Sequence, residues 1–438
     1  VFDEAHQLED TATMFFGSRL STAMLERLVR DARLVLRADS ESERHETRIL
    51  DAVLQRTSNF FSALPAGDNG GRAPLPPESI PEEELFALDN VLSELSAACR
   101  NVRPPREPVL QIARRADQLR EALGSLESPG QVSWALGFGS GRSPSVGSSP
   151  IDVGPILRER LHERVPCLVF TSATLTTGGD FKFLRQRLGI EAEVSEELVE
   201  SPFRYEEQAA LYAPPHMPDP RASDFIEAAA KEILALIEMS KGGAFVLCTS
   251  KRMMRLLAER VGKELDYEWF TQGDAPKQTL LDRFRDQGHA VLFATASFWE
   301  GVDVPGDPLS CLVLAKLPFA VPSDPVFVAR SEEMYDPVYH YAVPDAILRF
   351  RQGFGRLIRT KSDRGVAVVM DSRVLNKRYG ELFLESLPAC TVVRGPLSGL
   401  PEAAAAWLDE GVSLFEAEGS AVQDGDDGEL EYVEFDDL

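Results

Sequence analysis

The sequence lacks several features that mark membrane, secreted or zinc-binding proteins. Its five cysteines include no Cys-x-x-Cys pair, so the local signature of a zinc or iron–sulfur site is absent and a reducing cytoplasm is the expected location. No run approaches the roughly 18 consecutive apolar residues of a membrane span, and the N-terminus lacks the basic and apolar regions of a signal peptide. Apolar residues make up 44% and charged residues 26% of the 438, as in ordinary globular proteins.

The glycine-rich pattern G-x-x-x-x-G-K-[ST] is also absent. The nearest Gly-Lys pair, Gly262-Lys263, is followed by Glu264 and has no upstream glycine at the required spacing. The chain opens with Val1 rather than Met, and its first residues look like the end of a strand. We therefore expect the sequence to be truncated at its N-terminus.

Basic residues are scarce, since 46 Lys and Arg stand against 70 Asp and Glu for a net charge of −24. On charge alone a nucleic-acid partner is disfavoured, because phosphate binding needs Lys and Arg. The charge is uneven, however. Residues 416–438 contain ten acids and no Lys or Arg, which predicts a disordered acidic tail, whereas residues 349–364 contain six Lys and Arg with Asp363 as their single acid.

Five short apolar runs do not alternate with polar residues and are predicted to be buried strands. They cover residues 167–170, 244–248, 290–294, 311–315 and 365–370. Strands buried on both faces are typical of parallel sheets covered by helices. Helical spacing occurs between them at 224–239, 253–265 and 277–287. This alternation predicts a doubly wound α/β domain over residues 203–400.

Residues 20–125 have a different pattern, with long charged amphipathic stretches broken by a Pro/Gly-rich segment at 65–81. They predict a helical insertion between two parts of one α/β domain. The Gly/Ser-rich residues 137–150 are predicted to form a flexible loop.

Polar signatures follow three of the apolar runs and also the apolar pair Val1-Phe2, at the carboxyl ends of predicted strands, where ligands of parallel sheets bind. They are the segments at 3–6, 171–174, 249–251 and 295–303. Asp3 and Glu4 suit an arrangement in which one carboxylate holds Mg²⁺ through water and the other polarises an attacking water. The alternative is an acidic helix N-terminus.

Residues 344–360 are predicted to form one helix with an apolar face. Gln352, Arg356 and Arg359 gather on its opposite face, as arginine fingers that stabilise phosphoryl charge would. A solvated basic face is the alternative. Gly353 and Gly355 favour the first interpretation, because they cost helix stability and suit close approach to a neighbour or ligand.

Together these segments resemble the motifs of superfamily 2 helicases, in order and spacing. The resemblance rests on VFDEAH at 1–6 (motif II), TSATL at 171–175 (motif III), LCTS at 247–250 (motif IV), SFWEGVDVPG at 297–306 (motif V) and RQGFGRLIR at 351–359 (motif VI). The long insert between motifs II and III makes the sequence similar to the DinG/XPD-like DEAH-box branch. The resemblance covers roughly residues 1–20 and 130–400.

The resemblance implies two RecA-like α/β parallel-sheet domains, the first incomplete, with an arch-like α-helical insertion. It divides the chain into 1–20 and 129–200 (first RecA-like domain), 21–128 (insertion), 201–400 (second RecA-like domain) and 401–438 (acidic tail).

Roles for individual residues also follow from the resemblance. It implies catalysis by Asp3, which positions Mg²⁺, by Glu4, which activates water, and by Arg356 and Arg359, which reach the ATP phosphates. Nucleotide binding and coupling would involve His6, Ser172, Thr174, Glu300, Gly301, Asp303 and Gln352. Contacts to single-stranded DNA would come from Thr249, Ser250 and Lys251. Phe298 and Trp299 either stack on a base or belong to the core.

The resemblance further implies ATP and Mg²⁺ as cofactors, DNA single strands and duplex junctions as partners, 5′-to-3′ movement and a role in repair or replication stress. The missing phosphate loop, and the cysteines of any [4Fe-4S] cluster, would precede Val1, so we expect this chain alone to be inactive. Two alternatives remain open: a DNA-stimulated ATPase that remodels complexes without unwinding, and a DNA-binding part of a nuclease-linked protein.

Overall fold

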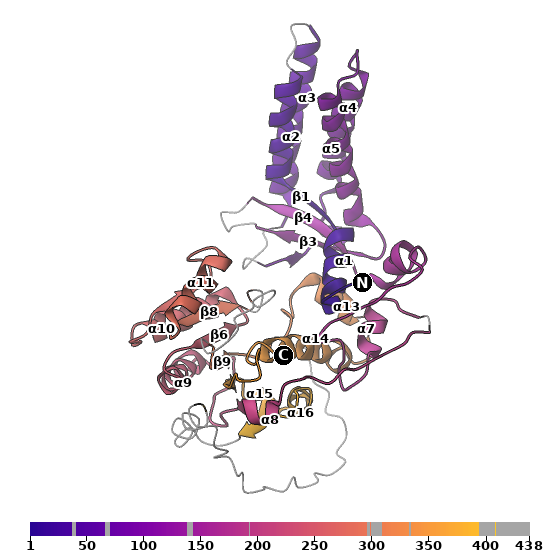
Figure 1. Ribbon diagram of the computed structural model, residues 1–438. Helices are drawn as coiled ribbons and strands as arrows, with labels where there is room; N and C mark the ends of the chain where they lie inside the picture. The colour runs from indigo at the N-terminus through magenta and orange to yellow at the C-terminus, as the bar shows by residue number, and fades with distance from the viewer. Residues whose placement is uncertain are drawn as a thin grey trace. The chain divides into compact units, whose positions relative to one another are not determined.

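A computed structural model provides the fold (Figure 1). It describes residues 1–36, 41–65, 71–137, 143–191, 193–295, 298, 309–332, 334–393 and 408. The chain divides into two compact units, which are described separately. Unit 1 contains Val1–Phe170, Arg185–Glu191 and Val321–Tyr335, and unit 2 contains Thr171–Leu184, Ala192–Ala320 and Asp336–Leu438. The domain boundaries given above stay a prediction.

Long helices dominate unit 1. They are α2 (Thr22–Val35), α3 (Glu41–Ala63), α4 (Glu82–Asn101) and α5 (Glu107–Gly124), and neighbouring helices run side by side (Figure 1). Ser21 caps the first of them, because its hydroxyl accepts a hydrogen bond from Met24 N. Leu28, Leu92 and Ile112 point into one shared core. These helices lie in the segment for which the sequence predicts a helical insertion.

Below these helices unit 1 has a four-stranded antiparallel sheet in the order β1-β4-β3-β2. Its strands are β1 (Ser18–Ser21), β2 (Ala73–Pro74), β3 (Gln131–Leu136) and β4 (Ser145–Pro150). The prediction of a flexible loop at 137–150 is wrong for β4, which is buried throughout. Its small residues allow close packing: a Cβ on Gly147 would lie 2.5 Å from the Trp134 ring, and Trp134 Nε1 donates to Ser149 Oγ at 3.1 Å.

Short helices complete unit 1. They are the 3₁₀ turns η1 (Ala5–Gln7), η2 (Pro77–Ser79) and η3 (Ser125–Glu127), the π-helical turn η4 (Arg158–His162), α1 (Leu8–Phe16), α6 (Gly154–Leu157) and α13 (Pro325–Glu332). The chain passes from unit 2 into unit 1 within α7 (Lys182–Arg187).

Unit 2 is built on a seven-stranded parallel sheet in the order β11-β5-β10-β9-β6-β8-β7. Its strands are β5 (Ala209–Tyr212), β6 (Ala244–Cys248), β7 (Trp269–Thr271), β8 (Val291–Thr295), β9 (Cys311–Leu314), β10 (Gly365–Val369) and β11 (Thr391–Val393). The predicted α/β class with a parallel sheet is confirmed. Four of the five predicted runs form β6, β8, β9 and β10.

Helices cover both faces of this sheet. They are α8 (Tyr205–Gln208), α9 (Phe225–Met239), α10 (Lys251–Gly262), α11 (Lys277–Gln287), η5 (Val338–Ala342), α14 (Val343–Phe354), α15 (Arg373–Asn376) and α16 (Arg378–Glu385). Successive residues of one strand enter opposite cores: Phe245 belongs to the same core as Phe350, and Val246 belongs to the same core as Ile233. The non-alternating apolar runs are therefore explained, since both faces are buried.

The fifth predicted strand, at 167–170, is wrong as a buried strand. Its pairing within the described residues is a single parallel bridge between Phe2 and Phe170, whose rings stack at 5.6 Å. One bridge covers little of the run, so Cys167 and Val169 are exposed. The predicted burial of Cys248 and Cys311 is confirmed.

In the part of the chain that the structure describes, no helix combines the length and apolar character of a membrane span.

Candidate functional site

The DEAH segment of unit 1 lies between a backbone anchor and a helix. Phe2 N donates to Val169 O at 2.7 Å, and Gln7 N donates to Glu4 O at 2.9 Å to close the turn that leads into α1. Glu4 itself has φ 51°, a left-handed conformation that is uncommon for residues other than glycine. Strained backbone of this kind gathers at functional sites, so the geometry supports a role for this turn.

The side chains of this turn lie close together. Glu4 N donates to Asp3 Oδ1 at 3.0 Å, and His6 Nδ1 lies 3.4 Å from Glu4 Oε2. Asp3 and Glu4 are exposed, whereas the His6 side chain is only 9% exposed. The structure thus brings together the three predicted residues of motif II.

These carboxylates fit Mg²⁺ better than a metal held by protein ligands alone. Among the described residues, no group of three or more His, Cys, Asp or Glu side chains is placed to hold a metal ion. Mg²⁺ keeps several waters and uses one or two carboxylates together with substrate phosphates. Two exposed carboxylates suit that mode of binding.

Motif III lies in unit 2 as a compact turn. Ser172 and Thr174 are adjacent, because Thr174 N donates to Ser172 Oγ at 3.2 Å and the two hydroxyl oxygens are 3.5 Å apart. Thr174 is 5% exposed. The two predicted coupling residues are therefore held together by a local hydrogen bond.

The predicted helix over 344–360 is shorter than expected. Helix α14 ends at Phe354, and Gly355 forms its C-cap, so Arg356 and Arg359 lie in the turn and loop beyond it. The helical-face argument for these arginines is wrong. Leu357 and Ile358 are still buried, at 2% and 1% exposure, because the loop itself packs on the core.

The two glycines of this segment differ in their surroundings, since a Cβ on Gly355 would lie 3.3 Å from Arg351 O, a tight contact within its own turn. A Cβ on Gly353 would lie 3.7 Å from Leu314 Cδ2, which is normal van der Waals contact. The predicted close approach at this position is therefore not seen. Gln352 remains at the end of α14, and its Nε2 atom is buried without a hydrogen-bond partner among the described residues. A buried amide of this kind fits a role in binding a polar ligand.

Asp363 holds the arginine loop in place, a role that the sequence analysis missed. Its Oδ2 accepts from the backbone of Arg359 and of Thr360, both at 2.8 Å, and its side chain is buried. Gln208 Nε2 binds the carbonyl oxygens of Thr360 and Asp363 at 2.9 Å. The signal was present, since a lone acid within a basic run suggests a structural partner.

Arg351 is a second residue that the sequence analysis did not select. Its Nη1 atom donates to Thr176 O at 2.7 Å and Thr176 Oγ1 at 3.2 Å, two residues beyond Thr174. Burial lowers the pKa of Arg351. The hydrogen bonds of Arg351 thus join motifs III and VI within unit 2.

Tyr205 lies near Arg359 of motif VI. Burial raises the pKa of Tyr205, and the charge of Arg359 opposes this shift.

The motif IV residues follow β6 at the carboxyl edge of the sheet, beside the end of β8. Thr249, Ser250 and Lys251 are exposed there, and the Ser250 hydroxyl caps α10 by accepting from Met253 N at 3.2 Å. Contacts of this trio to DNA stay a prediction.

Phe298 belongs to the core, since it is 5% exposed and lies in the cluster with Phe284 and Leu281. A buried ring cannot stack on a base, so the core alternative is correct for Phe298. Four other predicted residues, Trp299, Glu300, Gly301 and Asp303, lie outside the described residues.

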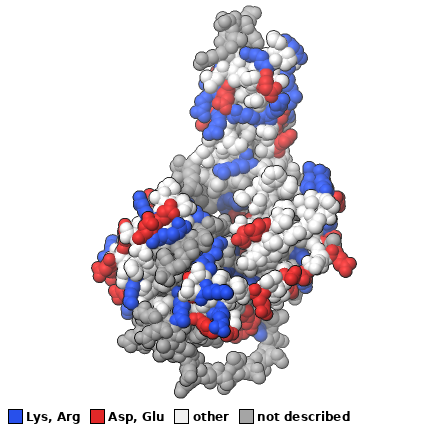
Figure 2. Space-filling view, in the orientation of Figure 1, with Lys and Arg blue, Asp and Glu red and all other residues white. Residues whose placement is uncertain are grey.

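The surface charge is mixed. On the face drawn in Figure 2, Lys and Arg side chains are interspersed with Asp and Glu, and the acidic residues do not form one continuous surface there. The ten acids of residues 416–438 lie outside the described residues and account for part of the net charge.

The α/β fold and these motifs are of the kind found in helicases. Residues 233–390 match the model of the helicase C-terminal domain family. The solved structure XPD_APO is similar to the chain, with a TM-score of 0.59 and 15% identity over 90% of this chain and 76% of that one. At that identity the likeness shows the fold.

Two relatives that are similar in sequence indicate which group of helicases the chain resembles. The chain is 35% identical over 395 residues to the ATP-dependent DNA helicase YoaA of Haemophilus influenzae, covering 89% of this chain and 62% of that protein. It is 32% identical over 269 residues to the 3′-5′ exonuclease DinG of Bacillus subtilis, covering 58% of this chain and 29% of that protein. The chain is thus similar to helicases of the DinG/XPD-like branch that the motifs predicted, and it spans less than two thirds of the length of these relatives.

Proposed function

We propose that the protein containing this chain is an ATP-dependent DNA helicase, which couples Mg²⁺-ATP hydrolysis to movement on single-stranded DNA. The observation that carries the proposal is the buttressed loop after α14, in which Asp363 fixes the backbone of Arg359. Arginines held in this way stabilise charge on a transferring phosphoryl group. The DEAH turn of unit 1 supplies the carboxylates that the same reaction needs.

Each residue then has a distinct role. Asp3 would hold Mg²⁺ through water, Glu4 would orient and deprotonate the attacking water, and Arg356 and Arg359 would neutralise charge on the γ-phosphate. Bound Mg²⁺ would supply charge neutralisation across the β- and γ-phosphates. The hydrogen bonds of Arg351 to Thr176 would pass changes at the arginine loop to motif III.

DNA is proposed as the partner on the printed names of the relatives and on the exposed polar residues at the carboxyl edge of the sheet. Thr249 and Lys251 would contact the phosphate backbone. Within unit 1, a hollow lined by Arg19, Arg27 and Arg115, together with Glu121, is a separate candidate contact with DNA phosphates. We further propose 5′-to-3′ movement, activity at duplex junctions, and a role in DNA repair.

The test uses the gene product that contains these 438 residues. We expect Mg²⁺-dependent ATP turnover stimulated by single-stranded DNA, and displacement of a duplex strand from a substrate with a 5′ overhang but not from one with a 3′ overhang. Arg359→Ala should abolish turnover, and the matched surface variant Arg260→Ala should not. The 438-residue chain alone should show no turnover above background. Absence of DNA-stimulated turnover in the gene product would contradict the proposal.

A second candidate follows from the Bacillus subtilis relative, which is named a 3′-5′ exonuclease. In that case the chain would serve as a DNA-binding part of a nuclease. Degradation of labelled DNA without ATP-dependent strand displacement would favour this candidate over the helicase. ATP turnover without strand displacement would favour a remodelling ATPase.

A further inference from the structure

Helix α13 belongs to unit 1, although the chain on both sides of it belongs to unit 2. Asp324 begins the helix, because its Oδ1 accepts from Val326 N at 3.0 Å and from Phe327 N at 3.4 Å. The other carboxylate oxygen of Asp324 lies 3.7 Å from Arg72 Nε. Helix α13, which lies between motifs V and VI in the sequence, is thus fastened at its start to another segment of unit 1.

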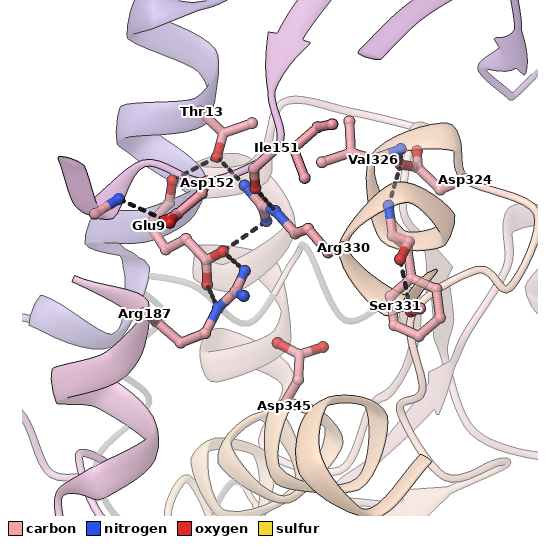
Figure 3. Close-up of polar contacts among 12 residues, drawn as sticks. Glu9, Thr13, Ile151, Asp152, Arg187, Asp324, Val326, Arg330, Ser331 and Asp345 are labelled. Carbon is pink, nitrogen blue, oxygen red and sulfur yellow. Dashed lines mark hydrogen bonds and ion pairs between the residues drawn. The ribbon is translucent and has the colours of Figure 1, made fainter. Parts of the chain in front are cut away.

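Arg330, near the end of α13, is almost completely buried, with 4% of its side chain exposed. Its guanidinium group contacts Glu9, Thr13 and Ile151 of unit 1 (Figure 3). Nη1 pairs with Glu9 Oε1 at 2.7 Å, Nη2 donates to Thr13 Oγ1 at 2.6 Å, and Nε donates to Ile151 O at 2.8 Å. The rigid fork of the guanidinium therefore joins α13 to α1 and to the chain after β4.

Glu9 is held by a second arginine. Arg187 Nε donates to Glu9 Oε2 at 2.8 Å, and Arg187 Nη2 pairs with Glu9 Oε1 (Figure 3). The Glu9 and Arg187 side chains are 16% and 11% exposed. One carboxylate thus sits between two largely buried guanidinium groups, and loss of Glu9 would remove the negative charge that balances them in a poorly solvated place.

The contacts of Arg330 constrain α1 at two points. Glu9 and Thr13 lie one turn apart on the same face of α1, and Thr13 Oγ1 also donates to Glu9 O at 2.8 Å. Two points on one face fix both the rotation of the helix about its axis and its position along the axis. Helix α1 continues directly from the turn that starts at Glu4.

We propose that Arg330 is a positioning residue for the DEAH carboxylates, a role that rests on the proposed function. Asp3 and Glu4 lie between two anchored parts of the backbone. The hydrogen bond of Phe2 N to Val169 O holds the chain before them, and the contacts of Arg330 with Glu9 and Thr13 hold α1 after them. Loss of the Arg330 contacts allows α1 to rotate, and the Glu4 carboxylate moves with this helix. Arg330 belongs to the sequence between motifs V and VI, so it ties that segment to the geometry of motif II.

The experiment compares variants of the gene product in steady-state ATP turnover. Arg330→Ala should lower kcat by about 100-fold, because misplacement of a catalytic group by about 1 Å has that effect, and leave KM for ATP within about twofold. Arg330→Lys keeps the charge but cannot reach all three partners with a rigid fork, so its kcat should lie between those of wild type and Arg330→Ala. The matched control is Arg114→Ala, which removes an exposed pair with Glu107 on α5 and should leave kcat unchanged.

Hydrogen exchange of the 438-residue chain supplies a readout independent of activity. In Arg330→Ala the amides of residues 8–16 should exchange at least about tenfold faster, as expected when local opening becomes easier. Amides of α4 and α5 should exchange at the wild-type rate. If Arg330→Ala fails to fold, Glu9→Gln, which keeps the shape of the side chain and removes its charge, should give the same kcat loss and the same local exchange.

The outcomes separate the two claims. Wild-type kcat and wild-type exchange in both the Arg330 and the Glu9 variants would overturn the positioning role while leaving the proposed function intact. Faster exchange in α1 with unchanged kcat would also overturn it, since Arg330 would then be merely structural. A wild-type gene product without ATP turnover would instead refute the proposed function.

Discussion

Arg373→Met tests how strongly a buried ion pair holds the carboxyl edge of the unit 2 sheet. Asp371 follows β10 and is fully buried, and its carboxylate accepts from Arg373 Nη2 at 2.7 Å, Arg373 Nε at 2.9 Å and Leu317 N at 2.9 Å. Burial alone lowers the pKa of Arg373, but the hydrogen bond and charge of Asp371 raise it above its ordinary value. Arg373 also lies over the Phe319 ring at 5.4 Å.

The magnitude follows from this geometry. Methionine keeps the volume but leaves the Asp371 carboxylate buried without its counterion, which costs about 3–5 kcal/mol. Asp371→Asn removes the buried charge, so the double variant should be less destabilised than the sum of the single variants by about 1–3 kcal/mol. Arg260→Met, which breaks an exposed pair with Glu227, should cost less than about 1 kcal/mol.

The assay is native-state hydrogen exchange of peptides from β9 and β10, which reports unit 2 separately from unit 1. A loss of about 3–5 kcal/mol corresponds to exchange that is faster by about two to three and a half powers of ten. The reasoning is refuted if Arg373→Met accelerates exchange by less than about fivefold, or if the effects of the two single variants simply add.

Two further predictions concern the backbone and the thiols of unit 2. Gly242→Ala should lower the free energy of unfolding in urea by more than about 2 kcal/mol, because its φ is 82° and a Cβ would lie 1.9 Å from His289 O. The control is Gly288→Ala, where φ is 68° but a Cβ would meet no atom within 4 Å, and it should cost about 1 kcal/mol. Burial raises the pKa of Cys248 and of Cys311 from 9.0 to about 12, so the unfolded state loses these protons first. Stability should therefore fall as pH rises from about 9 to about 12, by about 1.4 kcal/mol per pH unit for each thiol, and the double alanine variant should show a flatter alkaline limb.

Local composition predicted the inner strands β6, β8, β9 and β10 of unit 2, because burial on both faces demands continuous apolar runs, but it missed the inner strand β5. Val246, Phe293 and Val313 all lie in such runs and in the same core. The edge strands β7 and β11 were missed, since three residues with one neighbouring strand need no such run. Strand β4 was missed for another reason. Its Ser and Gly residues pack against Trp134, where a larger side chain at Gly147 would clash, and a local sequence pattern does not reveal this contact.

The candidate site was predictable by residue but not by geometry. Motif spacing selected Arg356 and Arg359, yet helical periodicity placed them on a helix that ends at Phe354. The loop is instead fixed by Asp363, whose bonds depend on tertiary folding. Arg330 lies outside the predicted motifs, and the partners described above are 179 or more residues away in sequence, so no local pattern identifies it.

Glu4→Gln in the gene product tests the central claim most directly, because it keeps the size of the side chain and removes only its ability to accept a proton. Binding of Mg²⁺-ATP, measured by equilibrium titration, should stay within a few-fold of wild type, while DNA-stimulated turnover should fall by at least about 100-fold, as expected for loss of a general base. Turnover by Glu4→Gln within a few-fold of wild type would contradict the account.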